Sequence, residues 1–196
     1  MPLINIMIDN IKVRVEEGIT ILDAAKKAGI KIPTLCAMPE LGFAPGSCRI
    51  CVVEVVGMPA LVASCAYPAR EGLNVHTNNK RVVRARKMTL EFLLANHPLD
   101  CMTCEKSGSC ILEDLAYDLG IKKSRFEQNK KEITIDNNNP FIARELDKCV
   151  LCGRCVEICN EIQQSNIIDF GYRGTKTEII VEGGTDLRNS NCVFCG

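Results

Sequence analysis

The chain has 196 residues, with 24 basic and 24 acidic side chains, 46% hydrophobic residues and 13 cysteines. The balanced charge and ample apolar content exclude a highly charged disordered chain and a strongly basic nucleic-acid-binding protein. The odd number of cysteines, many of them separated by two residues, favours metal ligation in a reducing compartment over a disulfide framework.

The first segment predicts a small mixed sheet crossed by one helix. Residues 3–15 alternate in polarity around a turn at Asp9-Asn10, as in a hairpin. Thr20 can cap a helix that runs to Ala28. Three further strands are expected, at residues 51–56, 61–64 and 73–76. Together these elements form the β-grasp arrangement, which we assign to residues 1–78.

The sequence predicts neither a signal peptide nor a membrane helix. The first ten residues lack a basic stretch and a small-residue cleavage site. The most apolar stretch, Val52 to Ala63, is broken by Glu54, Gly57 and Pro59. It is much shorter than the about 20 apolar residues of a membrane helix. We therefore expect a cytoplasmic protein with no membrane span and no nucleic-acid partner.

A small helical domain is expected at residues 79–120. Apolar residues recur at helical spacing between Asn79 and Asn96, and a second helix over 111–119 ends at Gly120. The opposite face of the first helix is basic: Lys80, Arg81, Arg84, Arg86 and Lys87. Because no aromatic residues alternate with these basic residues and the chain has no net positive charge, this face is interpreted as a solvated or docking surface.

A polar connector precedes the last domain. Residues 121–139 are rich in Lys and Asn and are followed by Pro140. They form the best domain boundary in the sequence. The last domain, 140–196, is expected to contain a helix and two strands, at 153–163, 167–170 and 178–181. The predicted fold class is therefore α+β.

The first cysteine set lies in the β-grasp segment. A pair two residues apart on a glycine-flanked loop can present two thiolates to one iron, and two distant cysteines can complete the site. Four thiolates suit a 2Fe-2S cluster, although the first interval departs from the plant-type spacing C-x4-C-x2-C. Zinc also takes four thiolates and remains an alternative. The set is Cys36, Cys48, Cys51 and Cys65.

The second set combines one histidine with three cysteines just after the long helix: His97, Cys101, Cys104 and Cys110. His97 precedes Pro98, where the helix must end, so its side chain can turn towards the cysteines. Such a set can hold a 4Fe-4S cluster or zinc, and ligand softness does not separate the two. His76 has no neighbouring cysteines and is interpreted as structural.

The third set is the bacterial ferredoxin run C-x2-C-x2-C-x3-C: Cys149, Cys152, Cys155 and Cys159. In this run three thiolates hold one 4Fe-4S cluster and the fourth reaches a second cluster. The spacing argues against zinc, which favours two-plus-two tetrahedral patterns.

Cys192 and Cys195 match the start of a second run of this type. In the crossed ferredoxin pattern they would share a 4Fe-4S cluster with Cys159. That cluster and the one at Cys149, Cys152 and Cys155 would then each lack a fourth ligand. We favour the interpretation that this sequence is a fragment of a longer protein; the alternatives are that the last ligands come from elsewhere or that these sites are degenerate.

The three patterns, in this order and across nearly the whole chain, resemble the N-terminal iron-sulfur region of the large subunit of NADH-quinone oxidoreductase (complex I). They are similar as well to the same regions of multimeric iron-only hydrogenases and NAD-linked formate dehydrogenase alpha subunits. The stretches NPFIARELDKCVLCGRC, IIDFGYRG and CVFCG are more similar to the hydrogenase and formate dehydrogenase branch, in which both ferredoxin-type clusters are retained.

The resemblance implies an electron wire with no catalytic site of its own: one 2Fe-2S and three 4Fe-4S clusters on the four ligand sets given above. It implies an NAD(P)H-oxidising flavoprotein, a thioredoxin-like 2Fe-2S subunit and a hydrogenase or formate dehydrogenase catalytic subunit as partners, with ferredoxin added in an electron-bifurcating complex. The alternatives are a complex I wire to quinone, a zinc-binding interaction module and a free-standing ferredoxin.

Overall fold

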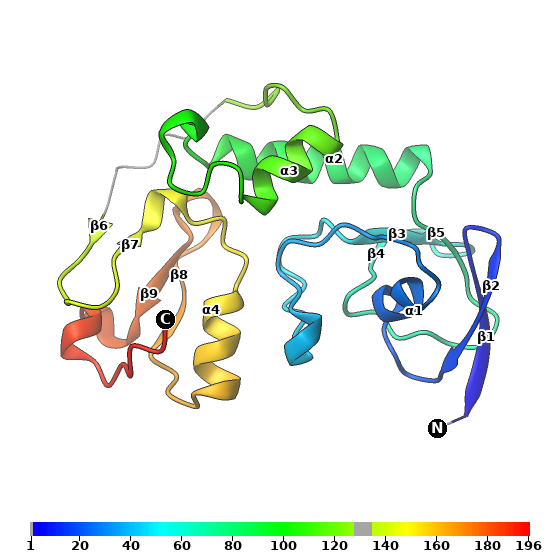
Figure 1. Ribbon diagram of the computed structural model, residues 1–196, viewed down its shortest axis with the longest axis horizontal. Helices are drawn as coiled ribbons and strands as arrows, with labels where there is room; N and C mark the ends of the chain where they lie inside the picture. Colours follow the sequence, from blue (N-terminus) through cyan, green and yellow to red (C-terminus); the bar gives the residue numbers. More distant parts are fainter. Residues whose placement is uncertain (1, 128–134) are drawn as a thin grey trace. The chain divides into compact units, whose positions relative to one another are not determined.

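The computed structural model describes residues 2–127 and 135–196, which fold into two compact units (Figure 1). Unit 1 consists of Met1–Glu91 and Gly108–Lys123, and unit 2 of Phe92–Ser107 and Ser124–Gly196. Both helices and strands are present, which confirms the mixed class. Within the described residues, no helix has the length and apolarity needed to cross a membrane.

Unit 1 is built on a five-stranded mixed sheet in the order β2-β1-β5-β3-β4. The turn between the first two strands has positive φ at Asp9 (47°) and Asn10 (69°), the backbone that a tight two-residue hairpin needs. The hairpin and the later strands agree with the sequence prediction. The strands are β1 Leu3–Ile8, β2 Ile11–Glu16, β3 Val52–Val55, β4 Val62–Ala63 and β5 Asn74–His76.

One helix, α1 (Ile21–Lys27), lies beside this sheet and confirms the predicted cap (Figure 1). The Thr20 hydroxyl accepts a hydrogen bond of 3.1 Å from the Asp23 backbone N–H. After the helix, Gly29 has φ of 73°, a conformation that glycine adopts without strain.

Thr20→Ala is expected to lower the free energy of unfolding by about 1 kcal/mol, because an N–H of the first helical turn loses its acceptor. Urea unfolding followed by circular dichroism measures the change. Thr34→Ala is the matched control, since Thr34 lies in the loop after α1 and, like Thr20, is partly buried. Equal stabilities of the two variants would contradict the capping role.

The core of unit 1 surrounds two of the predicted ligands. Alternate residues of the strands and one face of α1 are buried, for example Ile8, Ile21 and Val53, each 0% exposed. Cys51 and Cys65 belong to the same buried cluster. These sulfur atoms therefore lie in a water-poor interior.

Two helices follow the sheet: α2 (Lys80–Ala95) and α3 (Ile111–Asp118), both as predicted. The Asn79 side chain caps α2 by accepting a hydrogen bond of 2.9 Å from the Val82 N–H. The basic face predicted for α2 was wrong at Arg86, and an apolar residue of the same helix, Phe92, is half-exposed. Arg86 is only 4% exposed, whereas Phe92 is 49% exposed. Phe92 stacks on Phe126, which explains its position, with 4.2 Å between the ring centroids.

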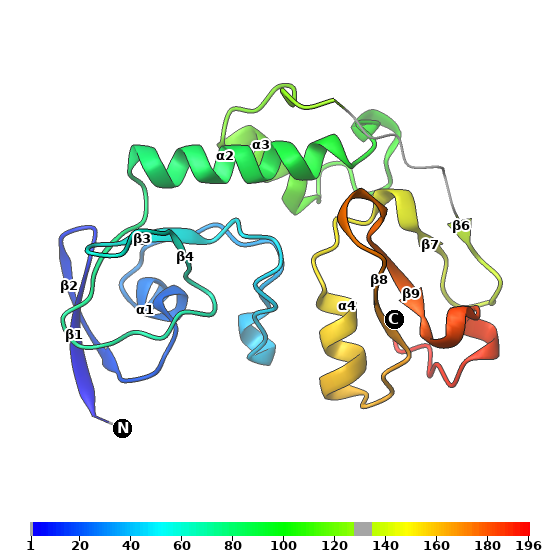
Figure 2. The same cartoon turned by 180° about the vertical axis from the view of Figure 1, so that it is seen from behind.

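Unit 2 contains a hairpin of β8 (Ile168–Gly171) and β9 (Glu178–Val181), with α4 (Arg154–Glu157) beside β8 (Figure 2). Helix α4 continues as a π-helical turn over Ile158–Ile162, so the predicted helix is present but changes its winding. A second antiparallel pair joins β6 (Ile135–Asp136) to β7 (Arg144–Glu145).

Within the predicted connector, Ile135 and Asp136 form a strand. The Arg144 side chain, which bonds the Asp136 carboxylate, fixes this pair. Residues 128–134 of the connector lie outside the described residues. The four-part domain division given above stays a prediction.

Candidate iron-sulfur sites

The four cysteines of the first set are brought together in unit 1. Their exposed fractions are 1% for Cys36, 4% for Cys48, 1% for Cys51 and 2% for Cys65. The sulfur atoms of Cys51 and Cys65 lie 3.3 Å apart. Cys36 forms side-chain hydrogen bonds with Cys48 and Cys65. Four buried sulfurs in mutual contact are a donor set that fits a 2Fe-2S cluster.

Strand pairing explains why the distant cysteines meet. In the β3–β4 pair, Val52 lies opposite Ala63, so the cysteine before β3 and the one after β4 reach the same end of the sheet. The Ser64 N–H and hydroxyl both donate to the Cys51 carbonyl, at 3.2 and 2.8 Å. Ser64 therefore fixes the two strand ends on which Cys51 and Cys65 sit.

The contacts among these sulfurs change their pKa values in opposite directions. Hydrogen bonds from Cys48 and Cys65 hold the pKa of Cys36 well below its usual range. The hydrogen bond with Cys65 lowers the pKa of Cys51 to about 6. Cys36 is the main cause of the raised pKa values of Cys48 and Cys65. These contacts thus stabilise thiolate, the form that binds iron, at Cys36 and Cys51, and the protonated thiol at Cys48 and Cys65.

The second set follows the end of α2. The His97 N–H donates to the Leu94 carbonyl at 3.3 Å, and a short 3-10 turn, Cys101–Thr103, presents the next cysteines. Cys110 precedes α3 as its N-cap residue. His97, Cys101 and Cys104 belong to unit 2 and Cys110 to unit 1, and each part is described by itself. Their shared cluster stays a prediction.

The third and fourth sets, in unit 2, share one local structure. In each C-x-x-C turn, the N–H two residues after the first cysteine donates to its sulfur at 3.4 Å, from Leu151 to Cys149 and from Phe194 to Cys192. Leu151 and Phe194 also share a positive φ, of 54° and 48°. Bulky residues rarely adopt this conformation, so both turns hold strained backbone that aims an N–H at sulfur.

Two cysteines from different runs meet at one small core. Cys159, after α4, and Cys192 both pack against a buried cluster that contains Ile167, Val181 and Leu187. The Ile167 N–H donates to the Cys159 sulfur at 3.4 Å. Figures 1 and 2 both place the C-terminus beside α4 and β8. The sharing of one cluster by Cys159 and Cys192 stays a prediction.

The other three cysteines of the run influence one another. Burial, followed by the charges of Cys149 and Cys152, raises the pKa of Cys155. The pKa of Lys148 is raised by Glu145, with a smaller contribution from Cys104. Lys148 directly precedes Cys149, so a residue next to the third set is influenced by the charge of one cysteine of the second set.

None of the 13 cysteines forms a disulfide. Within residues 2–127 and 135–196, no group of three or more His, Cys, Asp or Glu side chains is arranged to hold a single metal ion.

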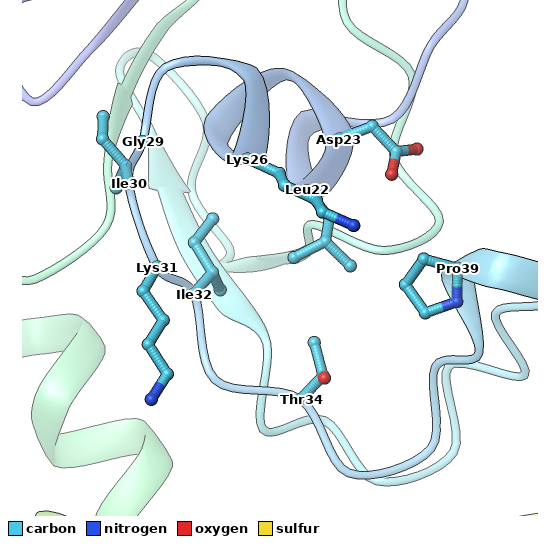
Figure 3. A pocket seen from close by; sticks show the side chains of 9 residues that line it. All are labelled: Leu22, Asp23, Lys26, Gly29, Ile30, Lys31, Ile32, Thr34 and Pro39. Carbon is cyan, nitrogen blue, oxygen red and sulfur yellow. The ribbon is translucent and has the colours of Figure 1, made fainter.

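A pocket of about 350 Å³ lies over α1 and the loop that leads to Cys36 (Figure 3). Leu22, Ile32 and Pro39 face its space, and the Lys31 side chain extends away from it. No cysteine lines the pocket, so it is separate from the metal sites. Its lining residues are Leu22, Asp23, Lys26, Gly29, Ile30, Lys31, Ile32, Thr34 and Pro39.

Sequence reasoning missed the groups that surround the sulfurs. The N–H of Ile50 donates to Cys48 at 3.5 Å, as Leu151 does to Cys149. The C-x-x-C spacing itself was the signal for these donors. Arg86 was also missed: its guanidinium Nη2 donates to the Val52 carbonyl at 2.8 Å, next to Cys51.

Two known sequence families match the chain. A family described as a 2Fe-2S iron-sulfur cluster binding domain matches residues 2–80. The NADH-ubiquinone oxidoreductase-G iron-sulfur binding region matches residues 86–125. The first match contains the first cysteine set and the second contains the histidine set.

Curated relatives extend the similarity over the last cysteines. The chain is 38% identical to the NADP-reducing hydrogenase subunit HndD of Solidesulfovibrio fructosivorans, over 100% of this chain and 34% of that protein. It is 40% identical to the NADH-ubiquinone oxidoreductase 75 kDa subunit of Reclinomonas americana, over 90% of this chain and 26% of that protein. The chain thus spans about a third or less of these relatives.

A solved structure is similar over most of its length. A chain in the crystal structure of NAD+-reducing [NiFe]-hydrogenase in the H2-reduced state aligns with a TM-score of 0.88 and 35% identity. The alignment covers 96% of this chain and 80% of that one.

Proposed function

Because this chain belongs to the iron-sulfur protein family shared by NAD(P)-linked hydrogenases and the large subunit of complex I, we propose that it relays single electrons between a flavoprotein and a distant catalytic site. The observation that carries the proposal is the convergence of Cys36, Cys48, Cys51 and Cys65 in a buried core. A β-grasp 2Fe-2S domain, a helical domain and a ferredoxin-like domain are the parts of this relay. Bound iron-sulfur clusters supply one-electron redox chemistry without breaking bonds in the protein.

The chain's own residues hold and insulate the redox centres. Thiolates bind iron, and backbone N–H groups, such as those of Ile50 and Ile167, donate to cysteine sulfur. These hydrogen bonds stabilise negative charge on sulfur, and burial limits water around it, so both set the potential. Three 4Fe-4S centres are proposed, on His97 with Cys101, Cys104 and Cys110, and on the two incomplete ferredoxin-type sets.

The order of the sites suggests the order of the relay. Cys104 and Cys149 both belong to unit 2, and the charge of Cys104 influences Lys148, which directly precedes Cys149. Electron transfer weakens steeply with distance, so neighbouring centres in one compact unit suit a relay. We place this module in the cytoplasm, where a reducing environment keeps so many cysteines available as ligands.

The proposed partners are an NAD(P)H-oxidising flavoprotein, a thioredoxin-like 2Fe-2S subunit and a hydrogenase catalytic subunit. Ferredoxin joins them if the complex bifurcates electrons. Formate dehydrogenase and complex I are the alternatives for the terminal chemistry. The complex I alternative is supported by the 40% identity to a complex I subunit.

Freeze-quenched EPR of the native complex, purified anaerobically, distinguishes these assignments. Hydrogen and NAD(P)H added separately are both expected to reduce the same set of centres. Reduction by formate in place of hydrogen would assign a formate dehydrogenase. Reduction by NADH alone, with reoxidation by quinone, would assign a complex I wire and overturn the hydrogenase proposal.

A further inference from the structure

Arg86 carries a positive charge into the core of unit 1. It lies on α2 between Val82 and Leu90, one turn away on either side, and both of these residues are 0% exposed. The Arg86 side chain is itself 4% exposed. Its Nη2 donates to the Val52 carbonyl at 2.8 Å, and its buried Nε has no hydrogen-bond partner among the residues that the structure describes.

No carboxylate in the described part of the chain forms an ion pair with Arg86. Asp9 is the acidic group that influences it, and that carboxylate already accepts hydrogen bonds from the Thr77 N–H, at 2.8 Å, and hydroxyl. Burying a cation without a partner is costly, so negative charge elsewhere in the same core must offset it.

The first cysteine set supplies that charge. Cys51 directly precedes Val52, whose carbonyl holds the guanidinium, and its sulfur lies 3.3 Å from that of Cys65. A 2Fe-2S cluster with four thiolate ligands is an anion. Burial lowers the pKa of Arg86, and the charges of Cys51 and then Asp9 act in the opposite direction.

We propose that Arg86 tunes the 2Fe-2S centre: its fixed positive charge stabilises the reduced cluster and so raises the reduction potential. The centre takes up one electron from its reductant, and Arg86 neither gains nor loses a proton. One-electron reduction adds a negative charge, which a nearby buried cation favours. The inference rests on the proposed function, because it requires a 2Fe-2S cluster on Cys36, Cys48, Cys51 and Cys65.

The test is an EPR-monitored redox titration with dithionite, read at a temperature where the fast-relaxing 4Fe-4S signals are broadened away. Arg86→Gln keeps a donor for the Val52 carbonyl without the charge, and Arg86→Lys keeps the charge. Arg84→Met is the matched control, because Arg84 lies on the exposed face of the same helix and its charge is screened by water and salt.

Arg86→Gln is expected to shift the 2Fe-2S midpoint potential downwards, while Arg86→Lys and Arg84→Met stay near the wild-type value. An assembled centre in Arg86→Gln with an unchanged or higher potential would overturn the inference and leave the proposed function intact. Absence of a 2Fe-2S signal in the wild-type protein would instead overturn the proposed function.

If the Arg86→Gln protein does not assemble the 2Fe-2S cluster, the Arg86→Lys protein tests whether the charge affects its potential. A buried ammonium loses its proton at alkaline pH, whereas a guanidinium does not. The midpoint of Arg86→Lys must then fall below that of the wild type as the pH rises. The inference would be overturned if the midpoint potentials of the two proteins changed in parallel as the pH rises.

Discussion

Replacing Cys65 by serine is expected to abolish the 2Fe-2S signal and leave the 4Fe-4S signals in place. Cys65 is 2% exposed, and its sulfur contacts Cys51 and Cys36, so its loss removes one of four ligands from a closed donor set. Total iron and acid-labile sulfide should each fall by about two per chain, the content of one such cluster. EPR and colorimetric iron and sulfide assays on the same sample measure both effects.

Cys155→Ser is the reciprocal control for this experiment. Cys155 belongs to unit 2, whereas the 2Fe-2S set belongs to unit 1. The variant should lose a 4Fe-4S signal and keep the 2Fe-2S signal. Loss of all signals in both variants would contradict separate sites, since it would mean that one substitution prevents the whole chain from folding.

Replacing His97 by cysteine is expected to lower the midpoint potential of one 4Fe-4S centre. Imidazole is neutral as a ligand and thiolate is negative, so the substitution adds negative charge beside the cluster and disfavours reduction. The same difference between the two ligands raises the potential of Rieske centres. His97 lies just after α2, where the 3-10 turn Cys101–Thr103 brings two thiols into the same segment of unit 2.

Potentiometric EPR titration of the His97→Cys protein measures this shift. His76→Cys is the control, because His76 lies on β5 in unit 1, away from the second ligand set in sequence. It should leave all 4Fe-4S potentials unchanged. An unchanged or higher midpoint in His97→Cys would mean that imidazole is not a ligand of that cluster.

Local sequence signals predicted the elements of unit 1 well. The Asp9-Asn10 turn and the Thr20 cap depend on side chains that act within a few residues of themselves, so their effect can be read without the tertiary structure. The candidate cysteine sets could be proposed for the same reason, because the C-x-x-C spacing reflects a local turn, and they stay predictions.

Which residues of α2 are buried was established only by the tertiary structure. Arg86 was assigned to the solvated face because it stands among Lys and Arg residues, although its spacing of four from Val82 and Leu90 places it on the buried stripe. Phe92 is one of the apolar residues at helical spacing, yet it is 49% exposed and stacks on Phe126, which lies far along the sequence. Neither contact has a local signature.

The most direct test of the whole account is the metal content of the anaerobically purified protein, with iron, zinc and acid-labile sulfide counted on one sample and low-temperature EPR after reduction. The account predicts iron and sulfide, a slow-relaxing 2Fe-2S signal and several fast-relaxing 4Fe-4S signals. Zinc in place of iron, without sulfide or a paramagnetic signal, would contradict it and make the chain a structural zinc-binding module.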